Sequence, residues 1–208
     1  MLSILVTNPK GGSGKTTIAT NLACAFAAAK QPTWLADVDR QRSSLNWLSR
    51  RPATAPAITG LDWVKNLGKP PDEEGVLVID APAAIRGKQT DALVVRADVV
   101  IVPVLPSAFD QETTSAFLKR LDDLKPIRKN KKSVAVLRNR VRRNSRAAAR
   151  LDFFMIGTGR QDLDALPDRA LYPELAAQGL GVFDLQTKPA VMQQQDWQAL
   201  LRFIEGAA

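Results

Sequence analysis

The sequence predicts an α/β fold, in which helices cover both faces of a doubly wound, mostly parallel sheet. Short, continuous apolar runs alternate with helix-like stretches along the chain. The first run leads directly into a glycine-rich loop, after which an alanine-rich helical stretch begins. Strands of a parallel sheet are buried on both faces, so they are apolar throughout, and helical crossovers connect them. We therefore expect strands and helices to alternate around one sheet.

The individual elements follow from these patterns in chain order. Strands are expected at residues 2–7, 33–38, 76–80, 99–104 and 133–137, and helices at residues 16–29 and 113–124. The stretch 51–71 carries several Pro and Gly residues, so we expect a surface excursion there, with a short helix over 61–67. The single Cys24 lies in an apolar stretch and is expected to be a core residue.

Composition indicates a globular chain with an unusual charge balance. The 208 residues are 45% hydrophobic, which allows a sizeable core and favours one domain, residues 1–208. No run approaches the roughly 18 apolar residues of a membrane span, and the first residues lack the features of a signal peptide. We therefore expect a cytoplasmic protein. The net charge of +8 suggests a polyanionic partner, either nucleic acid or a membrane surface.

The motif after the first predicted strand is typical of a phosphate-binding loop. It reads Asn8-Pro9-Lys10-Gly11-Gly12-Ser13-Gly14-Lys15-Thr16-Thr17. Backbone N–H groups of residues 11–14 can approach phosphate oxygens closely, and the N-terminus of the following helix favours the same anion. We expect Lys15 to reach the β- and γ-phosphates of ATP and Thr16 to coordinate Mg²⁺, with Thr17 beside them. A plain glycine turn between strand and helix is the alternative.

One departure from the ordinary phosphate-loop pattern is informative. Pro9 stands where that pattern has a glycine, and Lys10 follows it, so the loop carries two lysines. This arrangement resembles the deviant Walker A loop of the ParA/MinD family of ATPases. The resemblance implies that Lys10 crosses the interface of an ATP-dependent homodimer and contacts the other subunit's nucleotide, where a second cation offsets charge on the transferring phosphoryl group. A solvated loop lysine is the alternative.

Two carboxylates at predicted strand ends match further motifs of this family. Asp37-Val38-Asp39-Arg40-Gln41 resembles its Asp-x-Asp-Pro-Gln stretch, in which the second aspartate positions the attacking water. The resemblance gives that role to Asp39, while Arg40 replaces the usual proline. Asp80 ends the apolar run 76–79 as a Walker B aspartate does, and we expect it to hold Mg²⁺ through water. A capping role is the alternative for Asp39.

Two later segments resemble the family more loosely. Residues 102–107, followed by Asp110, are similar to its strand and loop near the base and the dimer interface. Residues 136–140 are similar to its Asn-Arg segment, in which the asparagine reads adenine, so the resemblance gives this role to Asn139. An amide side chain presents both a donor and an acceptor to a base edge. A simple turn residue is the alternative.

Positive charge is concentrated around the last predicted strand. No acidic residue falls between Lys125 and Arg150. If Asn144 caps a helix, Arg146 and Arg150 share one face, and an apolar stripe runs along the opposite face. Such a ridge suits sequence-independent contacts to DNA phosphates. The predicted DNA-binding residues are Arg140, Arg142, Arg143, Arg146 and Arg150. A solvated charged face is the alternative.

The C-terminus distinguishes DNA from membrane as a partner within this family. MinD-like members end in a basic amphipathic helix that docks on lipid. Here four apolar residues recur at helical spacing: Trp197, Leu200, Leu201 and Ile204. The polar face carries only one basic residue, Arg202. This pattern predicts a core-packing helix and no stable membrane association.

The resemblance covers nearly the whole chain and implies a small ParA-type ATPase, without the N-terminal DNA-binding extension of longer ParA proteins. Such a protein dimerises around ATP and binds the nucleoid non-specifically, until a small ParB-like adaptor stimulates hydrolysis and releases it. Its cargo would be a plasmid, a chromosome locus or an organelle such as a carboxysome. Three alternatives are a MinD-like membrane-associated ATPase, a P-loop metabolic or cofactor-assembly enzyme, and a non-hydrolysing nucleotide switch.

Overall fold

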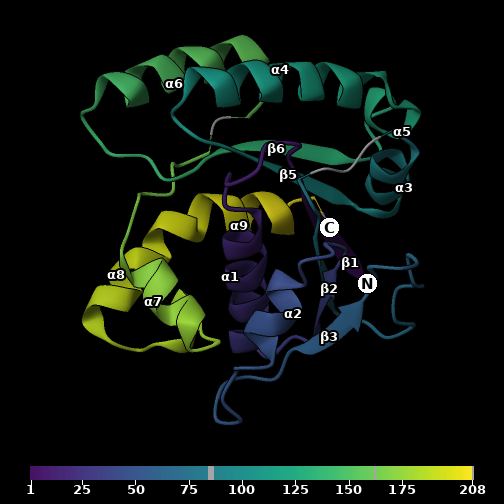
Figure 1. The fold of residues 1–208 in the computed structure, drawn as a ribbon, viewed down its shortest axis with the longest axis vertical. Coiled ribbons are helices and arrows are strands. Elements are labelled where there is room, and N and C mark those ends of the chain that lie inside the picture. The colour runs from purple at the N-terminus through teal and green to yellow at the C-terminus, as the bar shows by residue number, and fades with distance from the viewer. Residues whose placement is uncertain (84–86, 162, 208) are drawn as a thin grey trace.

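The computed structural model describes residues 1–83, 87–161 and 163–207, and it confirms the α/β prediction (Figure 1). Its sheet has the strand order β3-β2-β4-β1-β5-β6, and every neighbouring pair is parallel. The strands are β1 (Leu2–Val6), β2 (Thr33–Asp37), β3 (Thr59–Asp62), β4 (Val76–Asp80), β5 (Val99–Val104) and β6 (Ser133–Arg138). The five predicted strands all form, within one residue of their expected ends.

Helices cover both faces of this sheet. They are α1 (Lys15–Ala28), α2 (Ser43–Leu48), α3 (Lys88–Arg96), α4 (Ala108–Asp123), α5 (Lys125–Arg128), α6 (Arg146–Thr158), α7 (Leu171–Ala177), α8 (Lys188–Gln194) and α9 (Gln198–Glu205), with short 3-10 turns η1 (Val182–Asp184) and η2 (Gln195–Trp197). Figure 1 shows α4 and α6 side by side above the sheet, and α7, α8 and α9 together on the opposite side of the molecule. Helix α4 begins at Ala108, before the residue 113 expected from the sequence.

The core is divided in two by the central strands. Along β1, Ile4 and Val6 pack with residues of α1, α7 and α9, whereas Leu5 packs with residues of α3, α4 and α6. Strands β2, β4 and β5 are buried along their whole lengths. A strand that is covered on both faces needs an apolar residue at every position, which explains why continuous apolar runs predicted these strands correctly.

The expected helix over residues 61–67 is wrong. Residues Thr59–Asp62 form the edge strand β3 instead, paired in parallel with β2. Gly60 allows this strand to pack closely against α2. A Cβ at this position would lie 2.7 and 2.9 Å from side-chain atoms of Leu48 and Leu45. Strand β3 lies at the sheet edge and is mostly exposed, so it needs no apolar run, and the sequence pattern gives no signal for it.

The predicted cap of the helix after β6 is also wrong by one residue. Asn144 has a left-handed backbone (φ 61°), whereas an N-cap residue takes an extended backbone. Ser145 has that extended conformation, and its hydroxyl accepts a hydrogen bond from the N–H of Ala148 at 3.1 Å. The face prediction for this helix is nevertheless correct: Arg146 and Arg150 are exposed, while Leu151 is buried.

The C-terminal helix packs into the core, as its apolar pattern predicts. Trp197, Leu200 and Ile204 are buried against the sheet. The indole N–H of Trp197 donates to the hydroxyl of Tyr172 at 3.0 Å, and the two rings meet edge to face. Among the helices in the described residues, none has the length and apolar content needed to cross a membrane.

Truncation of Trp197 should measure how much α9 contributes to the core. We expect Trp197→Ala to lower the free energy of unfolding by about 3–5 kcal/mol, because it leaves a cavity and an unpaired Tyr172 hydroxyl. Urea unfolding followed by circular dichroism checks this. Met192→Ala is the control, since Met192 is 64% exposed and should change stability little. Equal urea midpoints for the two variants would contradict a core role for Trp197.

Candidate functional site

Three strands end together at the carboxyl edge of the sheet. Asp80 of β4 lies opposite Val6 of β1 in the register on one side and opposite Asp37 of β2 on the other. The loops that follow these strands therefore meet at one place. Ligands of open parallel sheets bind at this edge, where neighbouring crossovers leave in opposite directions.

The glycine loop between β1 and α1 needs glycine at two positions for its shape. Gly12 and Gly14 have left-handed backbones, with φ values of 77° and 90°. A Cβ on Gly14 would also lie 2.2 Å from the amide nitrogen of Asn139. That amide nitrogen donates to the carbonyl of Ser13 at 2.8 Å, so β6 holds the loop from outside. The loop has the backbone that an anion-binding turn requires.

Lys15 and Lys10 lie in different surroundings within this loop. The Lys15 ammonium donates to the carbonyl of Lys10 at 3.0 Å, inside the curve of the loop. Burial lowers the pKa of Lys15, against the opposing attraction of Asp80 and Asp39. The Lys10 side chain is half-buried, and within the described residues its ammonium has no hydrogen bond or ion pair.

Asp80 is the most perturbed carboxylate of the site. It is 1% exposed, and neither carboxylate oxygen has a hydrogen-bond partner in the described part of the chain. Burial raises its pKa to about 7, and Asp37 adds to this shift, while Thr16, Lys15 and Ser44 oppose it. The hydroxyl of Ser44 is also buried without a partner. Unsatisfied oxygens of this kind fit a hard cation such as Mg²⁺, which prefers oxygen ligands and keeps several waters.

Asp39 and Asp37 differ in role although they are two residues apart. One oxygen of Asp37 accepts hydrogen bonds from the N–H groups of Ser44 and Leu45, at 3.0 and 3.1 Å, and so caps α2. Asp37 is fully buried and structural, a role that the sequence analysis missed. Asp39 faces the cavity, and within the described residues its carboxylate accepts a hydrogen bond only from the N–H of Gln41, at 3.0 Å. One of its oxygens is therefore available to a ligand or water.

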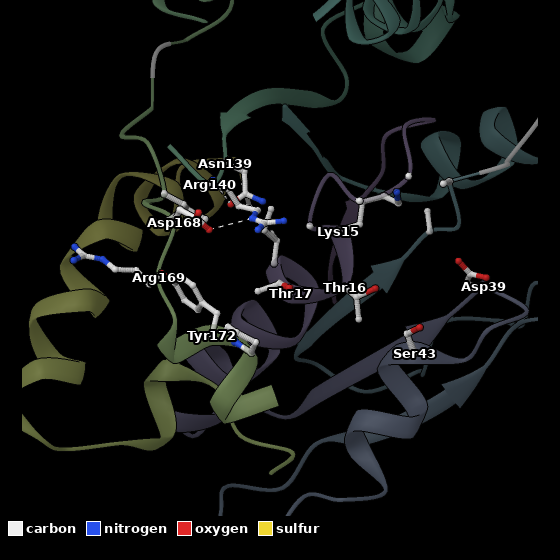
Figure 2. Close-up of a pocket in the computed structure, with 18 of the residues that line it drawn as sticks. Lys15, Thr16, Thr17, Asp39, Ser43, Asn139, Arg140, Asp168, Arg169 and Tyr172 are labelled. Atoms are coloured by element: carbon white, nitrogen blue, oxygen red, sulfur yellow. Dashed lines mark hydrogen bonds and ion pairs between the residues drawn. The ribbon is translucent and has the colours of Figure 1, made fainter. Parts of the chain in front are cut away.

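These groups line one end of a cavity of about 810 Å³ (Figure 2). Lys15, Thr16 and Asp39 gather toward that end, whereas Asp168, Arg169 and Tyr172 gather toward the other. The second wall is formed by the chain that precedes α7 and by the start of α7, and it was not predicted. It includes Leu166, Asp168, Arg169, Tyr172 and Pro173. No glycine motif or charge pattern marks these residues, so the sequence offered no signal for them.

Asn139 lies in the cavity wall, but its side chain already has protein partners. Its amide nitrogen donates to the carbonyl of Ser13, and its oxygen accepts from the N–H of Arg140 at 3.0 Å. The residue is buried. Reading of adenine by Asn139 therefore stays a prediction, and it would require the side chain to share or exchange these hydrogen bonds.

The predicted DNA-binding arginines occupy two different places. Arg140 and Arg142 line the cavity and pair with Asp168, at 3.1 and 3.3 Å. These hydrogen bonds and charges, led by Arg140, hold the pKa of Asp168 below its usual value. Arg143 approaches Asp196 at 4.0 Å. Only Arg146 and Arg150, exposed on α6, have no acidic partner within the described ranges.

The raised pKa of Asp80 should make the metal-free protein less stable as pH rises. An unfolded aspartate titrates at about 3.9. Between that value and the folded pKa of about 7, the folded state binds more protons than the unfolded state. The free energy of unfolding therefore falls with pH, by at most about 4 kcal/mol, and levels off above the folded pKa.

Asp80→Asn tests this because an amide cannot ionise. In EDTA, thermal unfolding from about pH 5 to about pH 8 should show a smaller loss of Tm for Asp80→Asn than for wild type. Asp72→Asn, at an exposed position, is the matched control and should follow the wild-type profile. Parallel pH profiles for wild type and Asp80→Asn would contradict the raised pKa.

Comparison with known proteins agrees with this fold. The chain is 26% identical over 195 residues to the maintenance of carboxysome distribution protein A of Halothiobacillus neapolitanus, covering 88% of this chain and 87% of that protein. Its fold is similar to a McdA variant of Cyanothece in complex with ATP (TM-score 0.69, 14% identity, 96% of each chain). It is equally similar to cobyrinic acid a,c-diamide synthase of Mycobacterium smegmatis with an ATP analogue and magnesium (TM-score 0.71, 18% identity, 100% and 97% of the chains).

The family comparison covers most of the molecule. A model described as the CobQ/CobB/MinD/ParA nucleotide binding domain matches residues 4–182. This stretch contains the glycine loop, both strand-end aspartates and the second wall of the cavity. It confirms the resemblance that the two lysines of the loop predicted. The chain therefore belongs to the CobQ/CobB/MinD/ParA family of nucleotide-binding domains.

Proposed function

We propose that residues 1–208 act as one ParA-like ATPase domain, which forms an ATP-dependent dimer on DNA and positions a cargo with the help of a partner protein. The observation that carries this proposal is the glycine loop, in which Lys15 is turned inward and the Lys10 ammonium has no partner among the described residues. The relative named for carboxysome distribution is similar over most of the chain. This favours a protein organelle such as a carboxysome as cargo over a plasmid or a chromosome locus.

The phosphate end of the cavity suits ATP with Mg²⁺. The N–H groups of residues 11–14 and the start of α1 would bind the phosphates, and the Lys15 ammonium would exchange the Lys10 carbonyl for a phosphate oxygen. The Thr16 hydroxyl and Asp80 would hold Mg²⁺, which supplies charge neutralisation at the phosphates. The unpartnered oxygens of Asp80 support this assignment. The free oxygen of Asp39 is suited to orient the attacking water.

Lys10 would act on the nucleotide of a second subunit. Its side chain lies on the same loop as Lys15, yet it has no partner among the described residues. In a dimer that sandwiches two nucleotides, this ammonium would meet charge that develops on the transferring phosphoryl group. Such an arrangement makes hydrolysis depend on dimerisation, so a partner protein that reshapes the interface can stimulate it.

Non-specific DNA binding would use the arginines that follow β6, so the active dimer would be associated with the nucleoid in the cytoplasm. Arg146 and Arg150 are exposed on one face of α6, without acidic partners in the described residues. Arg140, Arg142 and Arg143 would add to this surface once released from Asp168 and Asp196. The MinD-like alternative is less favoured, because the apolar residues of α9 are buried in the core rather than available to lipid.

Lys10→Ala should separate nucleotide binding from dimerisation. We expect the affinity for ATP to change by less than about threefold, because Lys10 is not among the described residues that line the cavity, while the ATP-dependent dimer disappears. Sedimentation velocity with ATP and Mg²⁺, alongside a fluorescent-nucleotide titration, measures both. Lys131→Ala removes an exposed charge elsewhere and should dimerise normally. A Lys10→Ala protein that still dimerises with ATP rules out the action of this lysine across the interface.

The combined Arg146→Ala and Arg150→Ala variant tests the DNA surface. Each lost phosphate contact should reduce the slope of log affinity against log salt by about 0.9, so the double variant should lose about 1.8 per protomer. Binding to a random-sequence duplex with ATP across a salt series measures this slope. Arg128→Ala with Lys129→Ala removes the same charge at the other end of β6 and serves as the control. An unchanged slope in the α6 variant removes these residues from the DNA surface.

A further inference from the structure

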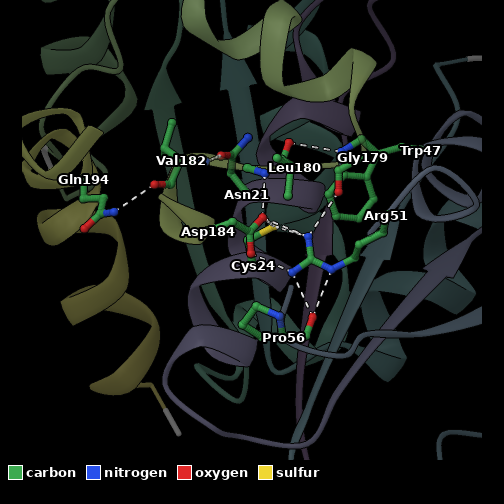
Figure 3. Close-up of polar contacts among 11 residues, drawn as sticks. Asn21, Cys24, Trp47, Arg51, Pro56, Gly179, Leu180, Val182, Asp184 and Gln194 are labelled. Carbon is green, nitrogen blue, oxygen red and sulfur yellow. Dashed lines mark hydrogen bonds and ion pairs between the residues drawn. The ribbon is translucent and has the colours of Figure 1, made fainter. Parts of the chain in front are cut away.

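A buried ion pair lies outside the cavity and is not used by the proposed function. The side chains of Arg51 and Asp184 are 5% and 1% exposed. The Arg51 guanidinium donates to both carboxylate oxygens of Asp184, at 2.8 and 2.7 Å (Figure 3). It also donates to the carbonyls of Pro56 and Gly179. Each member of the pair is thereby satisfied, which a buried charge requires.

Asp184 is held as firmly as its arginine partner. It accepts a hydrogen bond from the N–H of Gly181 at 2.8 Å and from the thiol of Cys24 at 3.2 Å. Burial raises the pKa of Asp184, but the hydrogen bonds and charge of Arg51 outweigh that effect and leave the pKa below its usual value. The pair is therefore charged at neutral pH, and it joins α1, through Cys24, to the turn η1.

Arg51 is rigidly attached to α2. Its N–H donates to the carbonyl of Leu48, the last residue of that helix, at 3.0 Å. Its guanidinium lies 5.4 Å from the centre of the Trp47 ring, and the indole N–H of Trp47 donates to the carbonyl of Leu180 at 3.3 Å. The carboxyl end of α2 is thus fixed to residues 179–184 by two side chains.

The backbones of Gly179 and Arg51 lie in close contact. Gly179 has φ 70°, and a Cβ on it would lie 2.4 Å from the backbone nitrogen of Arg51. Only glycine permits so close an approach between the end of α2 and the turn after α7. This observation is independent of the ion pair, and it too indicates that the end of α2 is fixed to residues 179–184.

The opposite end of α2 lies in the phosphate end of the cavity. Ser43, the first residue of α2, lines the cavity together with Gln41 and Asp39. Asp37 holds that end through the N–H groups of residues 44 and 45. A helix of six residues is only about 9 Å long. A displacement at Arg51 would therefore be carried along the helix to Ser43.

Residues 179–184 also contact the second cavity wall and α1, the helix that follows the phosphate loop. Helix α7, which carries Tyr172 and Pro173 in that wall, ends two residues before Gly179. Asn21 of α1 accepts from the N–H of Val182 at 2.9 Å and donates to the carbonyl of Thr17 at 2.8 Å. Three elements that line the cavity, α1, α2 and α7, are thus connected through residues 179–184.

We propose that Arg51 is a positioning residue for ATP hydrolysis. Through Asp184 it sets α2, and with it Asp39 and Ser43, at a fixed distance from the phosphate loop. This inference rests on the proposed ATPase function. Arg51 is not among the described residues that line the cavity, so its loss acts on the geometry of the reacting groups rather than on binding. Misplacement of such groups by about 1 Å lowers a rate by up to about a hundredfold.

Kinetics of two variants test the proposal. Arg51→Gln with Asp184→Asn removes both charges, so no unpaired charge is buried. We expect this variant to lower kcat at least about tenfold and to change KM for ATP by less than about threefold. Arg51→Lys keeps the charge but cannot serve all the acceptors of Arg51, so its kcat should lie between that of the double variant and wild type. Arg202→Lys, exposed on α9, is the control.

The outcomes of this experiment are distinct. A double variant that is folded, with a cooperative thermal transition, and has wild-type kcat overturns the proposal. Should the double variant fail to fold, Arg51→Lys decides in the same way: a folded Arg51→Lys with wild-type kcat overturns the proposal. If wild type itself hydrolyses no ATP, the proposed function fails. Hydrogen exchange then still tests whether Arg51 and Asp184 hold α2 in place.

Hydrogen exchange of residues 43–48 provides a readout that does not depend on ATPase activity. The N–H groups of Ser44 and Leu45 donate to Asp37. Loss of the Arg51–Asp184 ion pair should make these two N–H groups exchange at least about tenfold faster, while β5 and β6 stay protected. A purely local structural role predicts faster exchange only in residues 49–56 and 176–184. That confined pattern in Arg51→Lys would overturn the proposal even if its kcat fell.

Discussion

The side chain of Asn8 fixes the phosphate loop to the sheet, and the rest of the site depends on that attachment. Its amide nitrogen donates to the carbonyl of Pro103 at 2.7 Å and to the hydroxyl of Thr114 at 3.0 Å, while its oxygen accepts from the N–H of Lys10 at 2.8 Å. The backbone ladder between β1 and β5 ends just before, where Thr7 donates to Ile101. The side-chain amide of Asn8 therefore makes the next hydrogen bond from β1 to β5 in place of a backbone N–H.

With the loop fixed, the two buried aspartates beside it differ in one respect. Asp37 is surrounded by N–H groups from residues 39, 44 and 45, so its charge is compensated within the fold. Asp80 has no such donors among the described residues, and it is the carboxylate whose pKa is raised to about 7. A fold that leaves one carboxylate uncompensated beside a lysine and a threonine has stored an unfavourable interaction that a cation relieves. Asp37 therefore belongs to the scaffold and Asp80 to the site.

The sequence predicted the parts of the fold that local pattern controls. The central strands are covered on both faces, so their apolar runs were sufficient, and the left-handed backbone of the glycine loop is marked by its own glycines. Strand β3 is different, because it forms only where α2 and β2 accept Gly60 and its neighbours. The second cavity wall is also created by tertiary contacts: Leu166 donates to Arg138 and accepts from Val141, which places residues 166–173 beside the loop. No property of that segment alone predicts this position.

The arrangement of charge also depends on tertiary contacts that the local sequence does not reveal, and this bears on the proposed DNA surface. Between Lys125 and Arg150 the sequence has no acid, but Asp168 and Asp196 approach from later in the chain and pair with Arg140, Arg142 and Arg143. Strand β6 further separates the lysines before it from the arginines after it by about 20 Å, at opposite edges of the sheet. The nucleotide cavity opens at the carboxyl edge, so only the arginine group adjoins it. The proposed DNA surface is therefore better placed at the arginines that follow β6 than at the lysines before it, because Arg140 and Arg142 line the cavity.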